Sequence, residues 1–223
     1  MRIMNPGPED YHLHSLCFSD GLNTVDEIVQ FAGRCGLRRI AITDHCQAYL
    51  DSRGYAKKTT RSAVDRWRNV HNDVEVIFGV EADILNQSGD ISDHIQGLPG
   101  GFLVLSAHEK PFADDPATIT DAYVNAIRRH ADRIAFLGHP CAFYFERWVD
   151  IAAVVGCANE HGVPVEVDCA NLVNGKTNVE HLRRMLAEAD RVYLNSDAHT
   201  LYELDTARGA GLLRLGELGL ARL

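Results

Sequence analysis

The segment Arg39-Ile-Ala-Ile-Thr43-Asp44-His45 decides the fold, because a short apolar run ends there in side chains that can bind metal. The same arrangement recurs, so that six apolar runs each end in a group of histidine or acidic side chains. These groups are His12-Leu-His14 with Asp20, Thr43-Asp44-His45, Gly79-Val-Glu81, Ser106-Ala-His108, Gly138-His139-Pro140 and Ser196-Asp197-Ala-His199. Imidazole and carboxylate are ligands that Zn, Mn and Fe prefer. Nine candidate ligands are more than one ion can use, which indicates a multinuclear site.

Between and around these groups, apolar strands alternate with helical segments along the chain. We expect strands at 9–14, 39–43, 74–80, 101–106, 133–137, 163–167 and 191–195. We expect helices from the capping box Thr24-Val-Asp-Glu27 to Gly36, and at 61–72, 118–131, 147–161, 178–188 and 202–218. Seven such units with nearly continuous apolar strands predict a parallel sheet covered by helices, an α/β fold.

Each group of ligands lies at the carboxyl end of its strand or just beyond it, which is the face that carries the active site in βα barrels. An open doubly wound sheet would also bind ligands at that edge. However, six strands that contribute to one cluster require a closed ring. The longer loops, 46–60, 84–100, 109–117 and 169–177, lie on the same side and would wall the pocket.

Length and charge limit the classes of function that remain. With 223 residues the chain is expected to be a single domain, 1–223. Its net charge of -9 disfavours a long nucleic-acid partner, although bound cations would still accept a small phosphorylated substrate. No apolar segment approaches the ~20 residues that span a bilayer, and the first residues lack the apolar core of a signal peptide. We therefore expect no membrane partner, a cytoplasmic location and free cysteines; the sequence does not indicate the oligomeric state.

The ordered set of motifs between residues 10 and 199 resembles the polymerase and histidinol phosphatase (PHP) superfamily. The resemblance implies a distorted (β/α)7 TIM-like barrel with three divalent ions, Zn, Mn or Fe. It also implies three ligand sets, in which Glu81 bridges the first and second ions. These sets are His12, His14, Glu81 and Asp197 for the first ion, Glu81, His108 and His139 for the second, and Asp20, His45 and His199 for the third.

Two acidic residues inside the motifs are not expected to bind metal directly. Asp44 is interpreted as a partner of a ligand or as a helix N-cap, and Asp10 as a similar partner or as solvent-exposed. A two-metal amidohydrolase is the nearest alternative to the three-ion site, since those barrels also open with a His-x-His motif. The additional Asp20, His45 and His199 have no role in that scheme.

Two ions that share Glu81 can also share a water, whose pKa coordination would lower toward ~7. The resulting hydroxide would attack a phosphate monoester, so Glu81 and Asp197 are expected to act in catalysis through it. Arg147 and Lys176 are predicted to bind the phosphate. The alternative for each is that its side chain is only solvated.

The predicted function is hydrolysis of a small phosphorylated metabolite, with histidinol phosphate as one candidate. The chain differs from the histidinol phosphatases of the superfamily at Lys176, where they typically carry arginine. The alternatives are a nucleotide phosphoesterase similar to 3′-5′ exonucleases, the amidohydrolase, and a non-catalytic metal-binding domain.

Overall fold

Seven parallel strands form the centre of the computed structural model, which describes residues 1–54 and 73–220. Their order across the sheet is β11-β10-β9-β8-β4-β3-β2, and the two-residue strand β1 (Arg2–Ile3) pairs with the outer edge of β11. The expected number of strands and their parallel direction are therefore confirmed. The strands are β2 (Glu9–Asp10), β3 (Arg39–Ile42), β4 (Glu75–Ile84), β8 (Phe102–Ser106), β9 (Ile134–Leu137), β10 (Val165–Asp168) and β11 (Arg191–Asn195).

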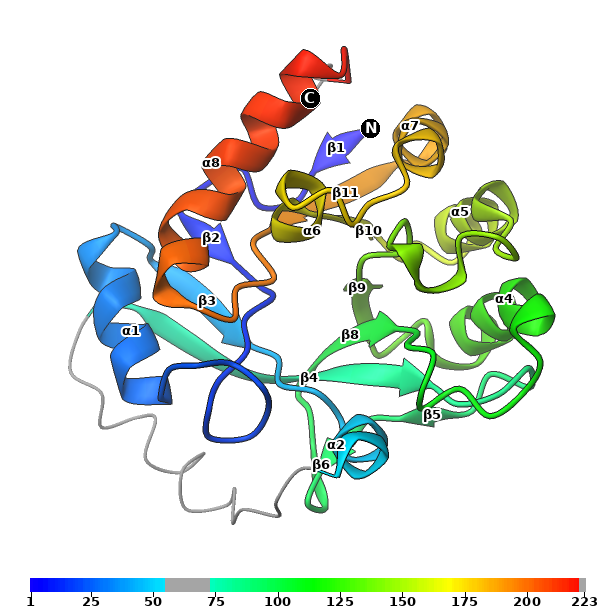
Figure 1. Ribbon diagram of the computed structural model, residues 1–223, viewed down its shortest axis with the longest axis horizontal. Helices are drawn as coiled ribbons and strands as arrows, with labels where there is room; N and C mark the ends of the chain where they lie inside the picture. The colour runs from blue at the N-terminus through cyan, green and yellow to red at the C-terminus, as the bar shows by residue number, and fades with distance from the viewer. Residues whose placement is uncertain (55–72, 221–223) are drawn as a thin grey trace.

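The sheet closes into a ring where the chain after β2 meets the chain after β11. Leu13 and Ala198 form a parallel bridge, and the His14 N–H donates to the Ala198 carbonyl at 2.9 Å. The expected TIM-like barrel is thus confirmed (Figure 1). The strand expected over 9–14 ends at Asp10 in the structure, because the residues beyond Asp10 pair with two different segments. Thr43 N–H donates to the Leu13 carbonyl on one side, while Ala198 bonds on the other.

Five of the expected helices pack around the outside of the ring (Figure 1). The capping box is present, since Thr24 accepts from the Glu27 N–H and Glu27 accepts from Thr24. The helix expected at 147–161 begins later than predicted, because Asp150 caps it through the N–H groups of Ala152 and Ala153. The expected helix 61–72 lies outside the described residues. The helices are α1 (Val25–Arg34), α4 (Ile119–His130), α5 (Ile151–Glu160), α7 (Val179–Glu188) and α8 (Leu201–Glu217).

Short elements lie almost entirely outside the expected strands and helices. They contain too few residues to show a helix or strand period in the sequence. None of the helices in the described ranges is long and apolar enough to cross a membrane. The short elements are β1 (Arg2–Ile3), α2 (Gln47–Arg53), β5 (Ile91–Ser92), β6 (His94–Ile95), β7 (Leu98–Pro99), η2 (Pro116–Thr118), η3 (Phe143–Phe145) and α6 (Cys169–Val173).

Aromatic side chains fill the inside of the ring below the carboxyl ends of the strands. The rings of Tyr11 and Phe102 stack with centroids 5.5 Å apart, and those of Phe136 and Tyr193 lie 4.7 Å apart. Because side chains alternate along a strand, the next inward position on β11 after Tyr193 is Asn195, and Asp197 follows just beyond the end of the strand. The apolar layer therefore ends where the polar cluster begins.

Candidate metal centre

The structure brings all nine expected ligands together at the carboxyl ends of the strands. Six of these nine residues are buried within the described structure, with Glu81 and His12 at 0% exposure. The most accessible are Asp20 and His199, with side chains 26% and 32% exposed. The cluster therefore has one open side, toward the residues after β2 and β11.

The first expected set has the spacing of atoms around one ion. The Nε2 atom of His12 lies 3.7 Å from Glu81 Oε1 and 3.6 Å from Asp197 Oδ1. The Nε2 atom of His14 lies 3.6 Å from Glu81 Oε2 and 3.1 Å from Asp197 Oδ1. An ion held at about 2.1 Å in tetrahedral geometry would separate its ligand atoms by about 3.4 Å. These four side chains can therefore hold one ion.

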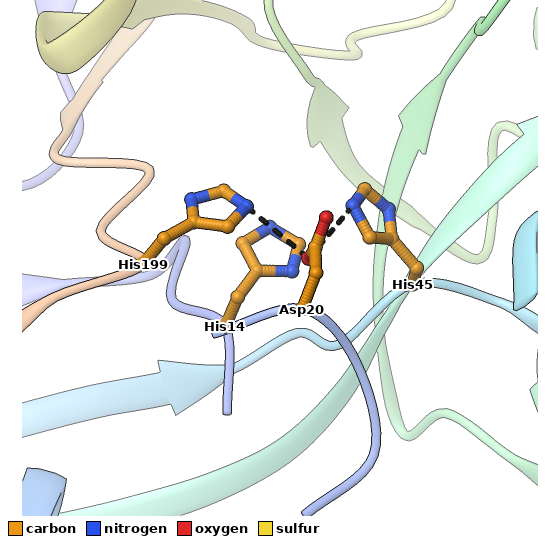
Figure 2. A group of neighbouring side chains, drawn as sticks. All are labelled: His14, Asp20, His45 and His199. Atoms are coloured by element: carbon orange, nitrogen blue, oxygen red, sulfur yellow. Dashed lines mark ion pairs between the residues drawn. The ribbon is translucent and has the colours of Figure 1, made fainter. Parts of the chain in front are cut away.

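The third expected set is centred on Asp20. The Nε2 atoms of His45 and His199 each lie 3.4 Å from Asp20 Oδ1. Figure 2 shows these two rings on either side of Asp20, with His14 next to them. All four residues offer ligand atoms within 4.8 Å of one another.

The division into three sets is less distinct than the expected assignment. His14 belongs to the group around Asp20 as well as to the group with His12 and Glu81. His45 also lies close to Glu81 and His108, and its Nδ1 is 2.6 Å from Glu81 Oε2. On the remaining side, His139 Nε2 is 2.7 Å from Glu81 Oε1. Which ion each histidine binds, and the number of ions, remain predictions.

Several buried ligand atoms in this cluster make no hydrogen bond of suitable geometry, although other ligand atoms lie close to them. They are His12 Nε2, His14 Nε2, His45 Nδ1, Glu81 Oε2 and Asp197 Oδ1. A buried polar atom without a partner costs free energy, so such atoms are rare unless something else binds them. Five of them facing one another, all nitrogen or carboxylate oxygen, fit a set of divalent cations.

The charges of the cluster strongly perturb its pKa values. Burial opposes the charged form, but the nearby Glu81 and Asp20 carboxylates raise the pKa of His45 to about 10. Likewise, against burial, Asp20 and Asp197 raise the pKa of His199 to about 9. For His14 burial dominates, together with the charges of His199 and His45, and its pKa falls to about 3. The carboxylates therefore favour positive charge at His45 and His199, as they would favour bound cations.

Two buried carboxylates that sequence reasoning missed contact the ligand rings. Asp83 accepts from the Nδ1 of His108 at 2.7 Å, and Glu166 from the Nδ1 of His12 at 3.0 Å. Both had a signal in the sequence. Asp83 lies two residues beyond Glu81 and so faces the same way on β4, and Glu166 is a lone charge within the apolar strand 163–167.

The other two acidic residues of the motifs are also buried. Asp44 accepts from the N–H and the hydroxyl of Ser15, both at 2.6 Å, and burial raises its pKa to about 7. It therefore fixes the turn after His14 and caps no helix. Asp10 is fully buried rather than solvent-exposed, and accepts from the N–H groups of His12 and Ser196.

A cavity of about 340 Å³ opens above the cluster. Lys176 is one of its lining residues, whereas Arg147 is exposed and is not among them. The contact of either side chain with a phosphate remains a prediction. Sequence reasoning did not identify the neutral side chains that also line the cavity, because they lie in short elements without a recognisable motif. These are Tyr49, Tyr144, Ala170, Asn171 and Asn174.

Comparison with known sequences identifies related proteins. The family model described as PHP domain matches residues 10–161. A protein of Escherichia fergusonii named probable phosphatase YcdX is 28% identical over 204 residues, which cover 88% of this chain and 80% of that protein. A probable phosphatase of a Shewanella species is 27% identical over 206 residues, covering 88% and 78%. The names of these relatives agree with the expected enzyme class, a hydrolase of phosphoric esters.

Solved structures with the same fold include a histidinol phosphate phosphatase of Lactococcus lactis, in complex with zinc, L-histidinol and phosphate. Its TM-score is 0.56 at 15% identity, over 91% of this chain and 93% of that one. A Listeria monocytogenes protein described as a candidate histidinol phosphatase has a TM-score of 0.60 at 11% identity, over 90% and 98%. At these identities the likeness establishes the barrel alone.

Proposed function

Because the chain belongs to the PHP domain family, we propose that it is a metal-dependent phosphatase that hydrolyses a small phosphate monoester. One observation carries the proposal: five buried ligand atoms make no hydrogen bond and face one another, and three of their residues, His45, Glu81 and Asp197, line a cavity. The names of the sequence relatives, probable phosphatases, support the same class of reaction.

The nine clustered side chains would hold divalent ions, two or three in number, with Glu81 shared between them. Such ions would lower the pKa of water to supply a nucleophile and would neutralise charge on the phosphate. Glu81 presents one oxygen toward His139 and the other toward His45, so one carboxylate can serve two positions. Asp197 faces both His12 and His14 and would complete the first position.

The remaining residues of the cavity would bind the substrate. Lys176 would contact the phosphate as a point charge. The phenol of Tyr144 and the amides of Asn171 and Asn174 would contact the leaving group, since they line the same cavity. Burial, with the charges of Asp197 and Glu81, raises the pKa of Tyr144, so its hydroxyl stays a donor at neutral pH.

The cavity volume supports a small substrate. At about 340 Å³ it lies at the lower end of the range of about 300–1,000 Å³ for small-molecule sites. Histidinol phosphate is the first compound to test, because the Lactococcus lactis structure contains L-histidinol and phosphate. Nucleoside monophosphates are the second.

A panel of phosphorylated metabolites tests the proposal. Metal-free protein is assayed for phosphate release with Mn²⁺, Zn²⁺ or Fe²⁺ added back in turn. Activity is expected on at least one phosphate monoester, with at least one ion, and none with a chelator present. The Glu81→Gln variant, prepared alongside, controls for contaminating phosphatases. Absence of phosphate release with every ion and every substrate would contradict the proposal.

A further inference from the structure

A buried carboxylate outside the nine ligands, Glu166 on β10, joins two of them from below. One of its oxygens accepts from His12 Nδ1 at 3.0 Å, and the other from the His139 N–H at 2.9 Å. The side chain is 1% exposed. In the part of the chain that the structure describes, no lysine or arginine forms an ion pair with Glu166. Its partners are thus the ligand residues themselves and one amide.

These contacts fix the two ligands in different ways. The bond from Nδ1 of His12 selects the tautomer whose Nε2 is free, and that Nε2 is one of the atoms in the cluster without a partner. The bond from His139 holds its backbone, whose φ of 28° is a conformation that residues with a side chain rarely adopt. Glu166 therefore orients the ring of one ligand and the main chain of another.

The network continues from Glu166 to the N-terminal segment. Asn195 Nδ2 donates to Glu166 at 2.8 Å, and Asn195 Oδ1 accepts from Asn5 Nδ2 at 2.9 Å. Asn5 in turn bonds to both the N–H and the carbonyl of Leu194, each at 2.9 Å. Asn5 and Asn195 are fully buried. Glu166 thus also has a partner outside the nine ligands, and that partner is itself held to the main chain of β11 through Asn5.

We propose that Glu166, held by Asn195 and Asn5, is a positioning residue that sets the affinity of the cluster for divalent ions through His12 and His139. This inference rests on the proposed metal dependence. Partners that orient metal ligands in this way typically change metal affinity or activity by about 10–100-fold when they are replaced. The alternative is a buried carboxylate that stabilises the barrel only.

The Glu166→Gln variant separates the two roles, because glutamine keeps the shape but loses the charge and one acceptor oxygen. Zn²⁺ and Mn²⁺ affinities are measured by competition with a chromophoric chelator, and melting temperatures are measured without metal. We expect affinity for at least one ion to fall by about 10–100-fold. The exposed Glu160→Gln variant is the matched control and should bind as the wild type does.

Unchanged metal affinity in Glu166→Gln, with a lower melting temperature of the metal-free protein, would overturn the inference and leave a structural role. If Glu166→Gln does not fold, Asn195→Ala carries the test, since it removes a support of Glu166 without altering a ligand. Its metal affinity should fall several-fold, and wild-type affinity would overturn the inference. Failure of the wild type to bind any ion would instead contradict the proposed function.

Discussion

Glu81 is the residue around which the cluster is organised, because its two oxygens face five histidine rings. The distances are 3.7 Å to His12, 3.6 Å to His14, 2.6 Å to His45, 3.7 Å to His108 and 2.7 Å to His139. Although burial favours a neutral carboxyl, the charges of His45 and His108 hold its pKa well below the usual value. One carboxylate therefore supplies negative charge to most of the site.

Replacement of Glu81 by glutamine should remove that charge and weaken every ion position that shares it. We expect metal content and phosphate release to fall by more than about a hundredfold, the upper figure for residues that act only through a ligand. The fold should persist, because the barrel core is apolar. Metal content by elemental analysis and circular dichroism check both points, and a metal-replete Glu81→Gln variant with normal turnover would contradict the shared role.

The raised pKa values of His45 and His199 predict how pH affects the protein without metal. Both values, about 10 and about 9, lie above the ordinary 6.5, so each protonated ring stabilises the fold fully below about pH 6.5. That stabilisation is lost as pH rises through 9 and 10. We expect the melting temperature of chelator-treated protein to decrease between about pH 7 and pH 10, and a rising value would refute the assignment.

Metal affinity should change in the opposite direction and increase with pH below the pKa values of these two rings. Histidine binds a cation in its neutral form, so each bound ion must displace the protons of His45 and His199. Each displaced proton makes affinity increase by about tenfold per pH unit below the pKa of that ring. Titrations with Zn²⁺ at about pH 6, 7 and 8 measure the slope; affinity independent of pH would show that these rings are not ligands.

Lys176 and Arg147 differ in position, which allows their expected roles to be compared. Replacement of Lys176 by alanine should raise KM, because Lys176 lines the cavity and a charge-assisted hydrogen bond contributes about 1.5–3 kcal/mol, or about ten- to a hundredfold. Arg147→Ala should change KM less, because its side chain is exposed and does not line the cavity. Steady-state kinetics on the best substrate measure KM for both variants. An unchanged KM in both would show that neither Lys176 nor Arg147 binds the substrate.

At the scale of elements, two helices begin with the same capping box but at different distances from the site. At the start of α1, Thr24 and Glu27 bond to each other, and neither bonds to an expected ligand in the part of the chain that the structure describes. At the start of α8, Glu203 accepts from Thr200 and also from the N–H of His199, at 2.9 Å. The second box therefore fixes both a helix end and an expected ligand.

This difference predicts separate effects for two matched variants. Thr24→Ala and Thr200→Ala should each lower the free energy of unfolding by about 1 kcal/mol, the usual contribution of an N-cap side chain. Only Thr200→Ala should also weaken metal binding, because it loosens the turn that carries His199. Denaturant titrations and metal titrations of both variants test this prediction. Equal metal affinities of Thr24→Ala and Thr200→Ala would show that the helix cap at Thr200 does not affect the site.

At the scale of the whole molecule, the cluster closes the ring, because its ligands come from both sides of the bridge between Leu13 and Ala198. His12 and His14 flank Leu13, while Asp197 and His199 flank Ala198. Ions bound there would connect the first and last strands of the barrel. Metal binding is thus expected to stabilise the entire fold as well as the site.

Removal of metal should therefore lower the melting temperature of the protein. A ligand that binds only the folded state at about a thousand times its Kd adds about 4 kcal/mol to the free energy of unfolding. Calorimetry with and without a chelator measures the shift, and Glu81→Gln should show a much smaller one. Equal melting temperatures of the wild type in both conditions would mean that no ion links the strands.

The sequence alone determined the barrel and the set of expected ligands. Apolar runs specify buried parallel strands, and the period of two places His12 and His14 on one side of the chain. Likewise, the capping-box pattern of Thr24 and Glu27 predicts the start of a helix. Such features depend on residues close together in the chain, so they can be recognised without the fold.

Only the tertiary structure decided which side chains support the ligands and which residues line the cavity. Glu166 reaches His12 across 154 positions of the chain, and Asn5 reaches Asn195 across 190. Tyr144 and Asn171 line the same cavity from separate short elements, whereas Arg147 does not, although it is near Tyr144 in sequence. Contacts between distant segments depend on strand order, ring closure and side-chain direction, which no local pattern of residues encodes.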